Sequence, residues 1–600
     1  MNRFVYLLCA ALLTGPALAA GASTDTEKRI AQIRQALLPQ VLVTGETPKT
    51  TPLADRMAEL NVPGVSIAVI HDGRIEWARG FGVKSVGGPP VTAETLFQAA
   101  SISKPVFALA VHRLVEEGKL NLDTNVNDYL ESWKLPDNEF TREQKVTLRR
   151  ILSHTAGLTV HGFPGYEAGA PLPSVTQILD GAPPANTAAI RVDVVPGTMH
   201  RYSGGGYTLA QLLVQDVTGQ PLPKLMHDLV LAPLGMNHST YEQPLAGSRS
   251  GEVALPHGGD GAPIAGGPHV YPEMAAAGLW TTPSDLARYA LGVREALAGK
   301  SKVISAATAR AMLTRQIGDH ALGPVVGGST ARKYYTHNGG NMGYRCVLVA
   351  YEDGEGAVVM TSGDNGGGLM YEVLRTIAHV YRWPDFGPPT RTIASVKPAV
   401  LDRLIGVYEL EDQSVYVVRK DGGKLVGNII GNGPVELFPS AQNELFARED
   451  DVIVRFDAGQ DGVIDTMKHR AYGWERAGKR VDEARARGVL AGVERAARRI
   501  QEQKADPRSE AALRKLIAGI ASGEPDYASM SIKLGDITRE QLKGLQQWFT
   551  GMGKLEAVTF QKVADNGADE FDVDFASGKL KMQVGFGEDG RMEIINLWPR

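Results

Sequence analysis

Residues 97–104 read Phe-Gln-Ala-Ala-Ser-Ile-Ser-Lys and lead into a helical pattern of apolar residues. The apolar spacing from Val106 to Val115 predicts a helix over about 102–117. Ser101 and Lys104 form the only Ser-x-x-Lys motif in the chain. Because residues three apart share a helix face, the lysine ammonium can reach the serine hydroxyl at the start of this helix.

A serine hydroxyl is a weak nucleophile until a neighbouring base takes its proton. Lysine serves as that base only where burial and nearby positive charge favour its neutral form. A helix N-terminus also favours the negative charge that develops on the attacking oxygen. The alternative is a helix-capping serine followed by a surface lysine. The motif alone does not decide between a nucleophile and a cap.

Two further short motifs follow in order along the chain. Tyr202-Ser203-Gly204 comes first, and His337-Asn338-Gly339-Gly340 comes second. Other His-x-Gly triplets begin at His71 and His257, but the first lies in a predicted hairpin turn and the second in a Gly/Pro-rich loop. Only His337 leads directly into a predicted strand, which spans residues 344–351.

The three motifs occur in the order found in β-lactamases and penicillin-binding proteins. Four longer segments agree with that family: Val62–Ser66, Phe97–Ser101, Leu152–Leu158 and Ala276–Leu286. Together they make residues 28–385 resemble serine hydrolases of the class C β-lactamase and penicillin-binding protein family.

The resemblance implies a role for each motif. Ser101 would attack a carbonyl carbon, and Lys104 and Tyr202 would share the general-base and general-acid work. Which of the two is the main base stays open. The backbone N–H groups of Ser101 and Gly340 would form the oxyanion hole. His337 would position the substrate or tune Tyr202.

Two departures from class C β-lactamases bear on the substrate. Gly204 stands where those enzymes carry an asparagine that binds the substrate's side-chain carbonyl, and His337 stands where they carry lysine. Gly204, Gly339 and Gly340 are expected to line the substrate site with His337. His-x-Gly is more typical of the family's DD-carboxypeptidases, D-aminopeptidases and esterases. We therefore expect acyl transfer on a peptide, small amide or ester, with poor β-lactam hydrolysis.

The histidines at positions 154 and 161 are interpreted as residues that structure a loop beside the cleft. Cys346 lies in an apolar run and is likewise expected to have a structural role, as a small buried side chain.

The order of elements predicts an α+β fold. Gly64–Ala78 reads as a β-hairpin turning at Asp72-Gly73. Two further strands are predicted at residues 344–351 and 356–362, near the other end of the same region. Strands at both ends of one region, with helices between them, indicate an antiparallel sheet flanked by helices.

Composition shifts after the Pro-rich stretch at 384–390. The predicted organisation is a signal peptide at 1–20, a serine hydrolase domain at 28–385, a small all-β barrel or sandwich at 398–478, and an α+β module of cystatin or NTF2 type at 481–600.

The N-terminal segment has Arg3, a short apolar run and small residues near Ala19, which is typical of an export signal. The mature protein is thus expected to be periplasmic or secreted, without a stable membrane anchor. The chain has 600 residues and a formal net charge of −4, so we expect no nucleic-acid partner. With two cysteines and no HExxH motif, we expect neither metal nor cofactor.

Other functions remain open. The chain could be a catalytically weak penicillin-binding receptor or sensor, or a true β-lactamase. A glutaminase-type Ser-Lys enzyme is a distant alternative on the same fold. An α/β-hydrolase is disfavoured because the chain contains no Gly-x-Ser-x-Gly elbow. Sequence leaves the oligomeric state unknown.

Overall fold

The computed structural model describes residues 24–411, 414–471, 474–587 and 589–599. The predicted signal peptide, residues 1–20, lies outside these described residues. Within them, no helix combines the length and apolar character needed to cross a membrane.

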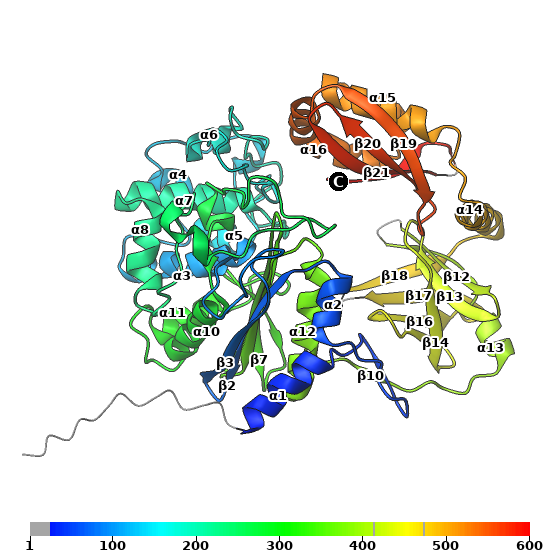
Figure 1. Ribbon diagram of the computed structural model, residues 1–600, viewed down its shortest axis with the longest axis horizontal. Helices are drawn as coiled ribbons and strands as arrows, with labels where there is room; N and C mark the ends of the chain where they lie inside the picture. The colour runs from blue at the N-terminus through cyan, green and yellow to red at the C-terminus, as the bar shows by residue number, and fades with distance from the viewer. Residues whose placement is uncertain (1–23, 412–413, 472–473, 588, 600) are drawn as a thin grey trace, which may run out of the picture.

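A six-stranded antiparallel sheet forms the centre of the first unit (Figure 1), with strand order β3-β2-β9-β8-β7-β6. In that order the strands are Arg74–Gly82, Gly64–His71, Gly356–Thr361, Tyr344–Tyr351, Lys333–Asn341 and Val325–Gly328. β2 and β9 pair directly, with Val65 opposite Thr361, although they come from the two ends of the unit. This confirms the predicted α+β sheet.

Helices cover both faces of this sheet. Helices α1 (Thr24–Gln35), α2 (Leu53–Glu59) and α12 (Gly366–Val380) lie on one face, and α10 (Pro283–Leu297) lies on the other. Successive residues of a strand point to opposite faces. Ile67 and Val69 accordingly join the core beside α12, whereas Ala68 and Ile70 join the core beside α10.

The remaining helices of the unit form a lobe around the buried helix α3. These helices are α3 (Ser103–Glu116), α4 (Val126–Tyr129), α5 (Leu148–Leu152), α6 (Val175–Asp180), α7 (Gly204–Thr218), α8 (Leu222–Met226), α9 (Met274–Ala277) and α11 (Ala306–Met312). A two-residue ladder between β4 (Phe97–Gln98) and β5 (Trp280–Thr281) ties the start of α3 to the segment after α9. Figure 1 shows the lobe on one side of the sheet.

The next unit is a closed eight-stranded antiparallel barrel. Its strands β11 to β18 are Gly406–Leu410, Val415–Asp421, Lys424–Ile429, Val435–Ala441, Glu444–Ala447, Val452–Ala458, Ile464–Ala471 and Trp474–Arg480. Val418, Val454 and Phe456 are fully buried in its core. Because β11 also pairs with β18, the barrel has no open edge. Of the two predicted forms, barrel or sandwich, the barrel is present.

The C-terminal unit is α+β. Helices α14 (Glu483–Glu502), α15 (Ser509–Ser522) and α16 (Ile532–Gly551) precede a four-stranded antiparallel sheet. The strands β19 to β22 are Leu555–Val563, Asp569–Phe575, Gly578–Phe586 and Met592–Pro599. Phe571 and Val573 on the sheet pack with Leu513 and Ile517 of α15. The domain limits given above, and the likeness to cystatin or NTF2-type folds, remain predictions.

Short segments connect the units. Strand β1 (Leu42–Val43) pairs with β10 (Thr390–Arg391), and α13 (Pro398–Asp402) leads into the barrel. The barrel residue Arg448 forms an ion pair with Glu46 at 2.7 Å. In the C-terminal unit, Gly544 of α16 lies close to the carbonyl oxygen of Asn186, which a Cβ at position 544 would approach to 3.7 Å. The C-terminal unit thus lies beside a loop of the helical lobe at this point.

Two element boundaries differ from the sequence predictions. His337 does not merely precede a strand; it lies inside β7, a strand whose polar and glycine-rich sequence has no alternating pattern. α7 begins at Gly204 rather than Tyr207, because Ser203 accepts a hydrogen bond from Gly206 N and so caps three glycines that have low intrinsic helix propensity.

Candidate active site

Ser101 lies in a single 3-10 turn, Ala100–Ile102, immediately before α3. The preceding residue, Ala100, has a φ of 48°, a left-handed conformation that costs a non-glycine residue roughly 1–2 kcal/mol. Ala99 N donates to Leu279 O at 2.8 Å, and Ile102 N donates to Ala99 O at 3.0 Å. These bonds hold the turn that presents the Ser101 hydroxyl.

Lys104 is 2% exposed and has its ammonium beside Ser101. Its Nζ donates to Ser101 Oγ at 3.1 Å and to the carbonyl oxygen of Ala276 at 2.8 Å. The structure therefore brings together the serine and lysine that the motif predicts, and the lysine is buried rather than on the surface.

Tyr202 lies in the segment before α7, with its ring 4.9 Å from Lys104 Nζ. The ring stacks on His154, with centroids 4.1 Å apart and an interplanar angle of 28°. His161 packs against the same ring at 4.8 Å. Ser101, Lys104 and Tyr202 thus converge from α3 and the start of α7.

The third motif approaches Ser101 through Gly339 on β7. A Cβ at this position would lie 2.3 Å from Ala99 O and 3.0 Å from Ser101 N, so only glycine permits the strand to come this close. β6 pairs with β7 only as far as Thr336. Beyond that point, the β7 edge that faces away from β8 has no strand partner among the described residues.

The register places the Gly340 N–H on this open edge. Asn341 and Tyr344 close the β7–β8 hairpin, and Gly340 stands opposite Arg345 in the next pair. In an antiparallel ladder, hydrogen-bonded and non-hydrogen-bonded pairs alternate, so the Gly340 N–H points away from β8. The Gly340 N–H is therefore not used by the β7–β8 ladder, and it belongs to the residue next to Gly339, which meets the Ser101 turn.

His337 is 6% exposed and uncharged at neutral pH. Burial, followed by the nearby Lys104 ammonium, lowers the pKa of His337 to about 3. Its Nδ1 donates to the Asn338 carbonyl oxygen at 2.6 Å, which leaves Nε2 as an acceptor. Its ring lies 6.4 Å from that of Tyr202. His337 therefore adds no positive charge to the site.

Gly204 is buried in the first turn of α7. Its N–H donates to His161 O at 3.0 Å, and a Cβ here would lie 3.0 Å from the ring of Phe163. An amide side chain at this position would meet Phe163. The segment 161–163 occupies the space that such a side chain would need.

Sequence reasoning missed the environment of Tyr202. The histidines at 154 and 161 were interpreted as loop residues, yet both rings contact Tyr202. A further pair, His200 and His320, stacks at 3.8 Å beside His154. The Leu152–Leu158 segment was the only signal that pointed to this region.

A buried carboxyl lies at the start of α9. Glu273 is fully buried, and burial raises its pKa to about 8. The helix it begins carries Ala276, whose carbonyl oxygen accepts from Lys104. Glu273 thus forms part of the wall that supports the lysine, in its neutral form at neutral pH.

No metal-binding role follows from the described ionisable residues near Ser101. The described residues that group like metal ligands are His71, Asp72 and Glu355, at the far hairpin turn. Glu355 already accepts from His71 Nδ1, Asp72 N and Trp383 Nε1. These bonds account for the cluster as a structural link between two turns.

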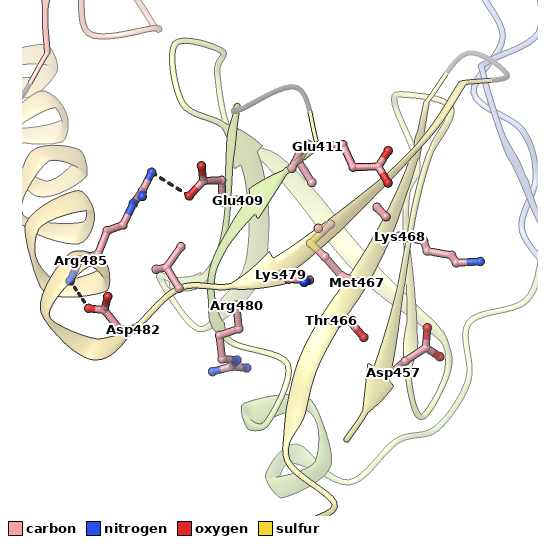
Figure 2. Close-up of a pocket in the computed structure, with 14 residues that line it drawn as sticks. Glu409, Glu411, Asp457, Thr466, Met467, Lys468, Lys479, Arg480, Asp482 and Arg485 are labelled. Atoms are coloured by element: carbon pink, nitrogen blue, oxygen red, sulfur yellow. Dashed lines mark hydrogen bonds and ion pairs between the residues drawn. The ribbon is translucent and has the colours of Figure 1, made fainter. Parts of the chain in front are cut away.

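A hollow of about 530 Å³ lies outside the first unit, on the barrel wall beside α14 (Figure 2). Acidic and basic side chains are mixed around it, and Arg485 of α14 pairs with Glu409 of β11 at 2.9 Å. Neither a serine nor a histidine is among its lining residues. It does not compete with the Ser101 site as a centre of acyl transfer.

Comparison with known proteins agrees with this geometry. The family model described as Beta-lactamase matches residues 53–381. The chain belongs to the beta-lactamase family of serine hydrolases. Penicillin-binding protein 4 of Amycolatopsis lactamdurans is 32% identical over 181 residues, which cover 30% of this chain and 45% of that protein. This serine hydrolase therefore spans less than half the length of that relative.

Penicillin-binding protein 4* of Bacillus subtilis (strain 168) is 23% identical over 410 residues, covering 62% of this chain and 85% of that protein. Among solved structures, the octameric penicillin-binding protein homologue from Pyrococcus abyssi is similar, with a TM-score of 0.48 and 22% identity. That alignment covers 71% of this chain and 98% of the other.

The close approach of β7 predicts different outcomes at adjacent glycines. Gly339→Ala should lower the rate of labelling by an acylating fluorophosphonate at least 100-fold, because its Cβ would push β7 away from Ala99 and Ser101. Gly340→Ala should lose less than about tenfold, since its Cβ would meet nothing nearer than Arg345 Cδ at 3.5 Å. Equal labelling rates for the two variants would contradict this packing.

Because Glu273 is buried, we predict that its contribution to the stability of the folded protein falls as pH rises. The unfolded carboxyl has a pKa near 4.5 and the folded one near 8, so its contribution is fully present below 4.5 and is lost as pH rises toward 8. The loss is up to about 1.4 kcal/mol per pH unit. Glu273→Gln should therefore gain stability relative to wild type between pH 5 and pH 8, measured by urea unfolding. A difference that does not change with pH would show that the carboxyl is not buried in this way.

Proposed function

We propose that the protein is an exported serine hydrolase that transfers acyl groups through an acyl-enzyme on Ser101, acting on short esters, small amides or peptides. The observation that carries the proposal is the 3.1 Å hydrogen bond from the buried Lys104 Nζ to Ser101 Oγ, with Tyr202 packed beside the same ammonium. A nucleophile with an adjacent proton carrier is the arrangement that acyl transfer requires.

The reaction proceeds in two steps, acylation and deacylation. Ser101 Oγ attacks the substrate carbonyl carbon while its proton passes to the one of Lys104 and Tyr202 that is deprotonated at that moment, as the neutral amine or as the phenolate. The backbone N–H groups of Ser101 and Gly340 stabilise the oxyanion. As the carbonyl re-forms, the alcohol or amine leaves and takes the proton. Water then attacks the acyl-enzyme and gives a proton to the same group, which returns it to Ser101 Oγ as the acyl bond breaks and the acid leaves.

The site favours neutral substrates over β-lactams. His337 is uncharged and places no fixed cation beside the oxyanion edge. Phe163 fills the space next to Gly204, so no side-chain amide is present there to orient an acylamino group. Both features support esters and small amides as better substrates than cephalosporins.

Export is part of the proposal because of the N-terminal segment. A basic residue, an apolar run and small residues near position 19 support delivery to the periplasm or the medium. We propose no stable membrane anchor and no nucleic-acid partner. Gly544 of α16 lies near Asn186 of the helical lobe, which supports a role for the C-terminal unit in shaping the cleft.

A penicillin-binding receptor is the second candidate, since two relatives are named penicillin-binding proteins. Such a protein would become acylated on its serine but would release the acyl group very slowly. Stoichiometric labelling by fluorescent penicillin without turnover of any ester would favour it over the hydrolase.

A substrate panel tests the hydrolase proposal. The wild-type protein should hydrolyse p-nitrophenyl acetate or butyrate with a higher kcat/KM than nitrocefin. The reason is that His337 supplies no fixed cation and Gly204 supplies no side-chain amide to hold a β-lactam. Ser101→Ala should lose several orders of magnitude on every substrate. A nitrocefin kcat/KM above that of both esters would refute the proposed preference.

A further inference from the structure

His154 binds the backbone on both sides of Tyr202. Arg201 N donates to the His154 carbonyl oxygen at 2.7 Å, and Ser203 N donates to His154 Nδ1 at 3.1 Å. The imidazole itself stacks on the Tyr202 ring at 4.1 Å. One residue therefore fixes the main chain before Tyr202, the main chain after it, and the plane of its ring.

Tyr202 needs such support because it belongs to no helix or strand. It lies just ahead of α7, and the first intrahelical contacts begin only with the Ser203 cap. Its hydroxyl position depends on two side-chain torsions and on the path of residues 201–203. A small rotation there would change the distance between the phenol and the Lys104 ammonium, which lies 4.9 Å from the ring.

The stacked imidazole is neutral and in one tautomer. Nδ1 accepts from Ser203 N, so it carries no hydrogen, and the ring proton must be on Nε2. His154 is 3% exposed, and burial, followed by the charge of Lys104, lowers its pKa well below the usual range. A charged ring at this place would lie beside another cation.

The groups around His154 come from every element packed against it. They are Lys104 of α3, Tyr207 of α7 at 5.3 Å, His200 at 6.0 Å, His320 at 5.9 Å and His337 of β7. None of these neighbours is a carboxylate. Nothing in this described surrounding stabilises a positive imidazole.

The backbone of His154 is also constrained. Its φ of 57° is left-handed, a conformation that histidine, asparagine and aspartate adopt more often than other non-glycine residues. The turn places the carbonyl oxygen toward Arg201 while the ring reaches Tyr202. Backbone strain of this kind persists where surrounding contacts determine the conformation.

We propose that His154 is a positioning residue for acyl transfer, an uncharged imidazole that holds Tyr202 in place beside Lys104. It touches neither substrate nor reacting atoms and acts through Tyr202. The inference rests on the proposed catalytic role of Tyr202. Its consequence is that the ring of His154 contributes to turnover rather than to substrate binding.

His154→Asn separates the ring from the backbone role. Asparagine adopts the same left-handed conformation and can offer Oδ1 to Ser203 N, but it removes the stacked ring. We expect kcat for p-nitrophenyl butyrate to fall 10–100-fold with KM changed less than threefold, and the pH profile of kcat/KM to shift by at least about half a unit. His200→Gln, which alters a neighbour of His154 without touching Tyr202, should stay within about threefold of wild type.

Tyr202→Phe tests the catalytic role of Tyr202 separately from the positioning role of His154. If it is as active as wild type, the proposed role of Tyr202 fails. If it is impaired while a folded His154→Asn protein keeps wild-type kcat and pH profile, the positioning role alone is overturned. Should His154→Asn not fold, ¹⁵N NMR of labelled histidine in the wild-type protein is decisive. A neutral Nε2–H tautomer at pH 6 supports the proposal, and a protonated ring at that pH overturns it.

Discussion

The site is built around one buried ammonium. Removing a lysine charge from water costs several kcal/mol unless hydrogen bonds compensate. Lys104 donates hydrogen bonds to Ser101 Oγ and to the Ala276 carbonyl oxygen, and it lies over the ring of Tyr202. Each of these partners comes from a different element. The hydrogen bonds and ring contact of the ammonium therefore require the Ser101 turn, α9 and the segment before α7 to meet at one point.

The sheet completes the site from the other side. β7 reaches the Ser101 turn because Gly339 has no side chain, and its edge beyond Thr336 is left open to a substrate. His337 on this strand stays uncharged because it is buried beside the same ammonium. Burial, and after it the positive charge of Lys104, thus keeps the neighbouring imidazoles uncharged. This explains why the described histidines His154 and His337 both have lowered pKa values.

Sequence reasoning identified Ser101, Lys104 and Tyr202 because their motifs are short and their chemistry is specific. It also predicted the hairpin at 64–78 and the return strands, whose apolar patterns are clear. It did not find β7, since Thr-His-Asn-Gly-Gly-Asn has no strand pattern and forms a strand only by pairing with β8. The start of α7 was hidden by three glycines. The strand depends on a partner distant in sequence, whereas the helix start depends on the local cap at Ser203, which the low helix propensity of the glycines concealed.

The contacts of His154 illustrate the same limit. Its stacking partner is Tyr202 and its hydrogen-bond donors are residues 201 and 203, all far along the chain from position 154. A histidine in a loop has no periodicity that would reveal them. Likewise, the burial of Glu273 follows from tertiary packing around α9 and not from its neighbours in sequence.

Mass spectrometry tests most directly whether Ser101 is the residue that becomes acylated. Wild-type protein is quenched within seconds of mixing with p-nitrophenyl butyrate or a fluorophosphonate, then digested and mapped. We expect a single adduct on the peptide that contains Ser101 in the wild-type protein, and no adduct in the Ser101→Ala variant. An adduct on another residue, or undiminished labelling of the alanine variant, would contradict it.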